Sequence, residues 1–264
     1  MDEKFLRLWA TKNKNDEWWS SFVTSPLAIC ANYMVVDYKW LTPNLITLFS
    51  FMTAIAATAF IIVGGQVNFY LAALLIHGSH ILDCMDGQMA RYRGISSRPG
   101  GFLDKMTDQI QVFLWFGTIG YAAYVQTQNI LPVFLAFTGV AFYSLRGYIK
   151  YVTIYIEMCD DKEYLNKKIQ EVSELEKKTE ETAGLGHGVL ANLQWFVGEQ
   201  RKILSFDEGV FIFILSVALI FNILTPVLWI FAISQTFYGI ARCLQRGRQL
   251  HLNQHPQILT TTEK

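Results

Sequence analysis

The chain reads HILDCMDGQMARYRGISSRPGGFLDKMTD between residues 80 and 108. This stretch holds four aspartates, one pair spaced by three residues and the other by four. Residues at those spacings share one face of an α-helix. The stretch therefore predicts two helices, each presenting a pair of carboxylates. The pairs are Asp83 with Asp86, and Asp104 with Asp108.

The segments around the aspartates are strongly apolar. Of the 264 residues, 52% are hydrophobic and 17% are charged, and the mean hydropathy is +0.25. A membrane-spanning helix needs roughly 20 mainly apolar residues. We therefore expect an all-α integral membrane protein with six transmembrane helices. The predicted spans are 43–64, 67–90, 102–125, 130–156, 207–222 and 225–242.

Charge placement predicts how these spans are oriented. The loops at 64–68, 126–129 and 222–226 contain no charged residue, and the 22 basic residues all lie on the other side or near its boundary. The positive-inside rule makes that side cytoplasmic. The first residues lack the apolar core of a signal peptide, and we expect a bacterial inner membrane. The net charge of zero disfavours a nucleic-acid partner.

The same pattern divides the chain into five regions. They are an N-terminal cytoplasmic or interfacial segment (1–40), four spans with the aspartates (41–156), a cytoplasmic helical segment (157–206), two further spans (207–245) and a cytoplasmic tail (246–264).

Two of these regions are open to more than one interpretation. Residues 16–40, with Trp18 and Trp19, predict either a helix lying in the membrane interface or a buried packing helix. Residues 160–182 predict a charged helix, either solvated or binding a partner. Residues 189–197 have an interfacial composition.

The two aspartate pairs lie at the cytoplasmic ends of the second and third spans, joined by a loop of about eight residues. We expect these helices to be antiparallel neighbours with all four carboxylates in one pocket. Two carboxylates about 4 Å apart repel by roughly 4 kcal/mol at an effective dielectric near 20. Bound divalent cations would offset this repulsion. Oxygen ligands without a nearby histidine or cysteine favour Mg²⁺, Mn²⁺ or Ca²⁺ over zinc.

Other residues of the stretch suit a phosphate ligand. Gly87 and Gly100 permit close approach to the backbone, and Arg91 can neutralise phosphate oxygens. The whole pattern, D-x2-D-G-x2-A-R-x8-G-x3-D-x3-D, has no mismatch to the signature of the CDP-alcohol phosphotransferases, which this chain resembles over about 40–245.

The resemblance implies an enzyme that moves a phosphatidyl group from CDP-diacylglycerol to a polar alcohol and releases CMP. Asp83, Asp86 and Asp104 would hold Mg²⁺ or Mn²⁺, with two ions expected. Asp108 would be the general base and a further metal ligand. The nucleotide site would be shaped by Gly87, Ala90, Arg91 and Gly100, with Asn44 and Thr47 near the nucleotide.

The motif does not name the acceptor. Inositol, inositol phosphate and glycerol phosphate are candidates, and Arg146 and Lys150, completed by Arg201 and Lys202, would form a basic pocket for one of them. The same cations could instead reach lipid headgroups, and Asp207 and Glu208 could bind hydroxyls.

Two alternatives remain. One is the opposite arrangement, in which CDP-choline or CDP-ethanolamine reacts with diacylglycerol. The other is a divalent-cation transporter or channel. Besides the CDP-alcohol, the acceptor and membrane lipids, the resemblance implies a second copy of the chain in a homodimer.

Overall fold

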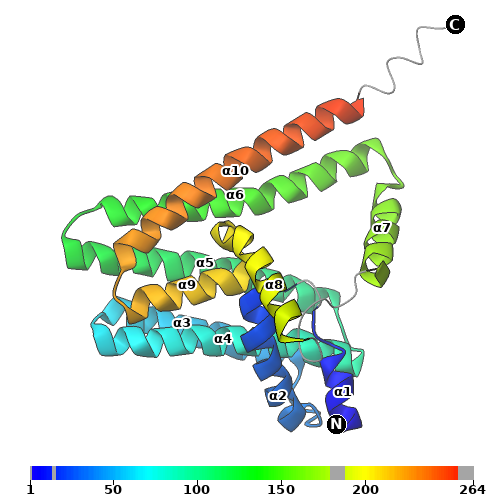
Figure 1. Cartoon of the computed structure of the whole chain (residues 1–264), viewed down its shortest axis with the longest axis horizontal. Coiled ribbons are helices and arrows are strands. Elements are labelled where there is room, and N and C mark those ends of the chain that lie inside the picture. The colour runs from blue at the N-terminus through cyan, green and yellow to red at the C-terminus, as the bar shows by residue number, and fades with distance from the viewer. Residues whose placement is uncertain (1, 14–15, 179–187, 255–264) are drawn as a thin grey trace, which may run out of the picture.

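The computed structural model describes residues 2–13, 16–178 and 188–254, and this part of the chain is all helical (Figure 1). The N-terminal part contains α1 (Glu3–Trp9), the π-helical turn η1 (Ser20–Thr24) and α2 (Ser25–Val35). Four long helices follow: α3 (Pro43–Val63), α4 (Gln66–Arg93), α5 (Arg98–Thr127) and α6 (Leu131–Asp160). The rest comprises α7 (Tyr164–Lys178), α8 (Val189–Glu199), the 3₁₀ turn η2 (Gln200–Ser205), α9 (Glu208–Ile220) and α10 (Leu224–Gln254).

Each of the six predicted spans coincides with one helix: α3, α4, α5, α6, α9 and α10. Among the described residues, only α3 and the Leu224–His251 part of α10 are long and apolar enough to cross a membrane by length and composition. At 1.5 Å per residue, the 13 residues of α9 extend about 20 Å. The helices are therefore as expected, while the six-span topology and the five-region division stay predictions.

Local chemistry explains where the helices next to the aspartates begin and end. Thr42 caps α3 by accepting a hydrogen bond from the Leu45 N–H at 3.3 Å, and Pro43 occupies the first helical position. Ser97 caps α5 in the same way through the Gly100 N–H at 3.1 Å. Gly94 ends α4 with φ +64°, a conformation that glycine adopts without strain. The loop between α4 and α5 is therefore residues 94–97, shorter than the eight residues expected.

The helices α4 and α5 meet at their aspartates, as expected, but they do not pack along their length. The helix α4 packs along α3 and α9, whereas α5 packs along α3 and α6. The two aspartate-bearing helices are therefore held by a common neighbour, α3, and face each other across a cavity near the ends that residues 94–97 join. In Figure 1, α9 runs between them in the view. This arrangement leaves room for cavities beside the carboxylates.

The main apolar core lies farther along the same helices. Phe116 of α5 stacks on Phe231 of α10 with ring centroids 3.7 Å apart, and Phe211 of α9 lies against both Phe116 and Trp115. Close approach of α6 to α10 requires Gly139, since a Cβ there would lie within 2.3 Å of the Phe231 ring. This core fixes α9 and α10 relative to α5 and so sets the far wall of the site.

The segment before α3 packs on the protein along one face. Ile29 and Ala28 of α2 are fully buried, and Asn32 donates to the Met85 carbonyl of α4 at 2.9 Å. Trp18 lies edge-on to Phe196 and Phe213, and Trp19 contacts His77. The buried-packing interpretation therefore describes this face. The opposite face of α2, with Leu27 and Met34, is exposed.

The segment between the fourth and fifth predicted spans differs in detail from expectation. The fourth long helix continues to Asp160, and α7 begins only at Tyr164, so the predicted charged helix over 160–182 starts later. Its last predicted residues, 179–182, lie outside the described part of the chain. The helix α8 covers the predicted interfacial residues and exposes Val189, Leu190 and Leu193.

Candidate active site

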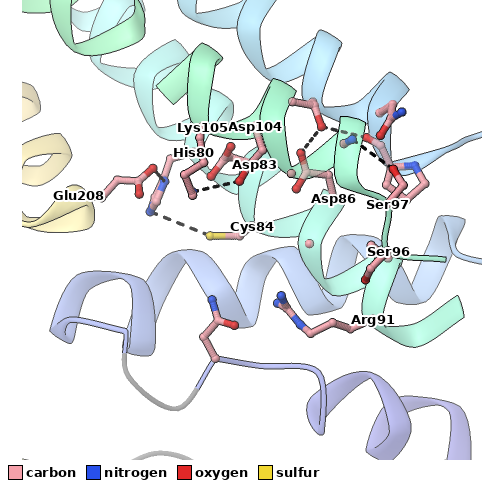
Figure 2. A pocket seen from close by; sticks show the side chains of 18 of the residues that line it. His80, Asp83, Cys84, Asp86, Arg91, Ser96, Ser97, Asp104, Lys105 and Glu208 are labelled. Atoms are coloured by element: carbon pink, nitrogen blue, oxygen red, sulfur yellow. Dashed lines mark hydrogen bonds and ion pairs between the residues drawn. The ribbon is translucent and has the colours of Figure 1, made fainter. Parts of the chain in front are cut away.

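Three of the four aspartates meet between α4 and α5. Oxygens of Asp83, Asp104 and Asp108 lie within 4.8 Å of one another, and Figure 2 shows Asp83 and Asp104 close together. One oxygen of Asp83, Oδ1, is buried and has no hydrogen-bond partner among the described residues. A buried carboxylate oxygen without a donor is unfavourable unless a cation meets it. The donor set therefore fits a divalent cation with oxygen ligands.

Asp86 lies outside this three-carboxylate group. Its side chain is 6% exposed and accepts a hydrogen bond from the Thr47 hydroxyl of α3. Asp86 still lines the same cavity as Asp83 and Asp104. The structure thus brings together three of the predicted metal ligands and places the fourth beside them, against α3.

Lys105 balances part of this negative charge. Its Nζ lies 3.0 Å from an oxygen of Asp104 and 3.1 Å from one of Asp108. The sequence analysis assigned no role to this residue. Its position between the two aspartates was nevertheless readable, because residues at i, i+1 and i+4 of a helix lie around one turn.

A polar cavity of about 310 Å³ lies beside Asp83, Asp86 and Asp104. All six residues predicted for the nucleotide site line it, namely Asn44, Thr47, Gly87, Ala90, Arg91 and Gly100. They come from three different helices, α3, α4 and α5. Their convergence agrees with the prediction of one site, while their individual contacts with a nucleotide stay predictions.

The N-terminal segment, which the sequence analysis left without a role, closes this cavity. Arg91 donates from Nε to the Thr11 carbonyl at 2.8 Å (Figure 2 shows Arg91 at the cavity edge). Asn13, Asp16, Glu17 and Ser20 line the cavity wall. Burial, followed by the nearby charge of Glu17, raises the pKa of Asp16 to about 6. No motif marks these residues, so nothing in the sequence pointed to them.

A second cavity, of about 590 Å³, lies on the other side of the carboxylates. Asp108, Arg146 and Lys150 line it, as do Asp207 and Glu208 of the α9 entrance. Its walls include apolar side chains, namely Met106, Val112, Phe113, Trp115, Phe211 and Ile212. Asp83 and Lys105 line both cavities, so the acidic group stands where the two meet.

The predicted basic pocket is only partly present. The Arg146 Nη1 already donates to the Ser205 carbonyl and to Gln235 Oε1 at 2.5 and 2.6 Å, and its Nη2 lies 3.8 Å from Asp207. Lys150 is exposed at the cavity. The side chains of Arg201 and Lys202 lie outside the part of the chain that the structure describes. Arg242 of α10 also lines the cavity.

One expectation about the metal ligands is wrong. The aspartates do have a histidine nearby, because His80, Asp83 and Glu208 form a second group with ligand atoms within 4.8 Å (Figure 2). Cys84 lies on the other side of the imidazole, 4.0 Å from Nε2. His80 precedes Asp83 by three residues, which places both on one helix face. Glu208 arrives from α9, and its approach could not be read from the sequence.

The described residues thus form helices that carry a group of carboxylates between two cavities, an arrangement that suits metal-assisted transfer between two substrates. Comparison with known proteins gives the family: residues 40–166 match the family model for CDP-alcohol phosphatidyltransferase, so the chain carries a domain of that family. All eight motif positions fall within this region. The family consists of membrane-embedded transferases, and the predictions of family and enzyme class are confirmed at that level.

Two individual proteins are also similar to this chain. An uncharacterized protein of Aquifex aeolicus (strain VF5) is 34% identical over 97 residues, which cover 36% of this chain and 48% of that protein. The match thus spans about half of that relative. Phosphatidylinositol phosphate synthase (PgsA1) of Mycobacterium tuberculosis, solved with CDP-DAG bound, aligns with a TM-score of 0.49 and 16% identity, covering 85% of this chain and 93% of the synthase. Similarity of this size does not define a substrate.

Proposed function

We propose that this protein transfers a phosphatidyl group from CDP-diacylglycerol to the hydroxyl of a polar alcohol and releases CMP. The observation that carries the proposal is the position of Asp83, Asp104 and Asp108 at the junction of two cavities. A transfer reaction needs two substrates to meet at one phosphorus, and the junction provides such a meeting point.

The two cavities differ in a way that suits two different substrates. The first is lined by glycines, hydroxyl side chains and Arg91, which fit a nucleotide with its phosphates. The second is larger and combines apolar walls with the charged residues Lys150 and Arg242. We assign the cytidine diphosphate to the first cavity and the acceptor, together with lipid chains, to the second.

The acidic group would hold one or two Mg²⁺ or Mn²⁺ ions through Asp83, Asp104 and Asp108, with Asp86 at the edge. When bound, such ions neutralise the pyrophosphate and stabilise charge on the transferred phosphoryl group. Lys105 would then exchange its contacts with Asp104 and Asp108 for contacts with solvent or substrate. Its side chain is 62% exposed, so this movement has room.

Asp108 is the proposed general base because it lines the acceptor cavity and belongs to the acidic group. The acceptor oxygen forms a bond to the phosphorus distal to cytidine, and its proton passes to an Asp108 oxygen. The bond from that phosphorus to the bridging oxygen breaks, and CMP leaves with the bonding electrons. Atoms and charge balance without any further reactant.

The chemistry of the second cavity favours a small polyhydroxyl or phosphorylated acceptor. Lys150 offers a cation, while Asp207 can accept hydrogen bonds from hydroxyl groups. Arg146 contributes less than expected, because Ser205, Gln235 and Asp207 already hold its guanidinium. We place the protein in a bacterial inner membrane with these cavities on the cytoplasmic side, as the charge pattern indicates.

One experiment tests the proposal directly. The purified protein is incubated with CDP-diacylglycerol, Mg²⁺ and each alcohol of a panel containing inositol, inositol phosphate, glycerol phosphate and serine. We expect CMP and one new phospholipid, identified by mass spectrometry, with no product from the Asp108→Asn variant. A parallel reaction contains CDP-ethanolamine or CDP-choline with diacylglycerol. Product only in that reaction would overturn the donor assignment, and product in neither would overturn the proposed function.

A further inference from the structure

The imidazole of His80 is buried, and its contact with Ser20 at Nε2 fixes its orientation. Its side chain is 5% exposed, and Nε2 lies 2.9 Å from the Ser20 hydroxyl oxygen. The Ser20 hydroxyl itself donates to Glu17 Oε1. Because that proton is already committed to Glu17, the Ser20 oxygen can only accept from His80. The proton of the neutral ring is therefore on Nε2, and Nδ1 carries a lone pair.

The lone pair on His80 Nδ1 faces the carboxylates of Asp83 and Glu208, which are hydrogen-bond acceptors. His80 Nδ1 is buried without a hydrogen-bond partner among the described residues, and the same holds for Asp83 Oδ1. His80 Nδ1 lies 3.8 Å from Glu208 Oε1. One nitrogen and two carboxylates thus surround a small space, with ligand atoms within 4.8 Å of one another, and neither His80 Nδ1 nor Asp83 Oδ1 has a hydrogen-bond donor among the described residues (Figure 2). This arrangement is repulsive unless a positive charge occupies the space.

The 3.8 Å distance between His80 Nδ1 and Glu208 Oε1 fits a metal ion shared by the two atoms and does not fit a shared proton. A proton on Nδ1 would form an N–H···O hydrogen bond of about 2.7–3.2 Å, and 3.8 Å is too long for one. Two ligands each about 2.1 Å from a common ion are roughly 3–4 Å apart, depending on the angle between them. The distance between His80 and Glu208 therefore suits two ligands of one ion.

We propose that His80 Nδ1, Asp83 and Glu208 form a second metal site, adjacent to the three-carboxylate group and selective for a first-row transition-metal dication such as Mn²⁺. An imidazole ligand favours such ions over Mg²⁺ and Ca²⁺, which prefer oxygen alone. Asp83 belongs to both groups, so its carboxylate can bridge two ions. The site stands on geometry and does not depend on the proposed transfer reaction.

The surroundings of His80 resemble the support that metal-binding histidines have in other proteins. Such a histidine usually binds the metal through one ring nitrogen and donates a hydrogen bond from the other ring N–H to an oxygen that the protein itself orients. That hydrogen bond fixes the orientation of the ring and its tautomer. Here Ser20 and Glu17 supply that support. They are pressed against the start of α9 at Gly209, where a Cβ would lie 1.8 Å from Glu17 Oε1 and 2.5 Å from Ser20 Oγ. The same contact holds the neighbouring Glu208 beside His80.

The test uses the full chain in detergent, stripped of metal with EDTA and then loaded with Mn²⁺. Pulsed EPR detects nitrogen modulation when an imidazole is bound directly to Mn²⁺. We expect that signal in the wild-type protein and its loss in His80→Gln. The matched control is His77→Gln, which removes an imidazole one turn away that contacts Ser216 and Trp19 instead. The signal should survive in that control and in Asp108→Asn.

Two further variants test the proposed metal site without changing His80 itself. Glu208→Gln should bind one Mn²⁺ fewer per chain by elemental analysis, and Ser20→Ala should bind Mn²⁺ about 10-fold more weakly. A wild-type protein without nitrogen modulation, or a signal that persists in His80→Gln, would overturn the mixed site. Loss of the transfer activity alone would not, because the readout is ligation and not turnover.

Discussion

Gly100 of α5 lies directly against Asn44 of α3: a Cβ at Gly100 would lie 2.8 Å from Asn44 Oδ1. Both residues line the proposed nucleotide cavity, so the missing side chain of Gly100 sets the position of Asn44. Gly100→Ala should displace Asn44 and raise KM for the CDP-alcohol by about 10-fold, a change of roughly 1.4 kcal/mol. Steady-state CMP release measures this effect.

The neighbouring glycine provides the control for that substitution. A Cβ at Gly101 would meet nothing within 4 Å, although Gly101 lines the same cavity. Gly101→Ala should therefore keep KM within about twofold of the wild-type value, at the same helix-propensity gain. If the two variants behave alike, crowding of Asn44 is not what Gly100 prevents.

Asp108→Asn should lower kcat by about 10² to 10⁴-fold, because an amide cannot take the acceptor's proton. Circular dichroism should be unchanged, since the amide has nearly the same shape as the carboxylate. Asp161→Asn is a suitable control, because that aspartate pairs with Lys167, accepts a hydrogen bond from the Glu163 N–H and lies outside both cavities. Near-normal CMP release by the Asp108 variant would remove the general-base assignment.

Removal of divalent cations should abolish turnover, and Mg²⁺ or Mn²⁺ should restore it. Asp83→Asn should raise the Mg²⁺ concentration needed for half-maximal activity by at least about 10-fold, because it weakens the group that Asp83 forms with Asp104 and Asp108. Titration of EDTA-treated enzyme measures both effects. Full activity in excess EDTA would contradict the proposed role of the carboxylates.

Arg146 and Lys150 should respond differently to replacement by glutamine. Arg146→Gln breaks hydrogen bonds to Ser205 and Gln235, so we expect a loss of about 1–3 kcal/mol in the free energy of unfolding and a lower Tm. Lys150→Gln should leave Tm unchanged and raise KM for a phosphorylated acceptor severalfold. An unchanged Tm in the Arg146 variant would argue that these hydrogen bonds contribute little to the fold.

Asp16 should make stability depend on pH. Its pKa of about 6 in the folded protein lies above the ordinary value of 3.8, so the folded state binds the proton more tightly than the unfolded state. Stability should therefore fall as pH rises from about 4 to 6 and stay lower above that range. Lys12, Arg91 and the Asn13 amide oppose this shift, and burial and Glu17 produce it.

Asp16→Asn should remove that dependence and raise Tm at pH 7 relative to the wild type. Thermal unfolding at pH 5 and pH 7 in the same detergent compares the two proteins. A wild-type Tm that rises between those pH values, with a smaller rise in Asp16→Asn, would show that Asp16 acts in the opposite direction.

The sequence predicted those parts of the fold and site that depend on neighbours along the chain. Helix periodicity placed Asp104 and Asp108 on one face, and the motif named Gly87, Ala90, Arg91 and Gly100, which line the proposed nucleotide cavity. The first predicted span began at residue 43, where α3 does begin, because capping by Thr42 involves only residues a few positions apart.

The features that were missed depend on contacts between distant segments. Glu17 and Ser20 reach His80 across about 60 residues, and Glu208 approaches from the far end of the chain. The separation of α4 and α5 along their length was also missed, because it results from both helices packing on α3. A short loop predicts that two helices are close but not that they pack along their length.

Glu17, Ser20 and Glu208 lie outside residues 40–166, the region shared with the family model. A fragment cut at those boundaries would keep all four aspartates yet expose His80 and Asp83 to water on two sides. Water would then donate hydrogen bonds to His80 Nδ1 and Asp83 Oδ1, which have no hydrogen-bond partner among the described residues. The affinity of the site for cations should therefore fall. The aspartate motif alone therefore does not reproduce this site. Its electrostatic environment also depends on Glu17, Ser20 and Glu208, which lie outside the region that the family model matches.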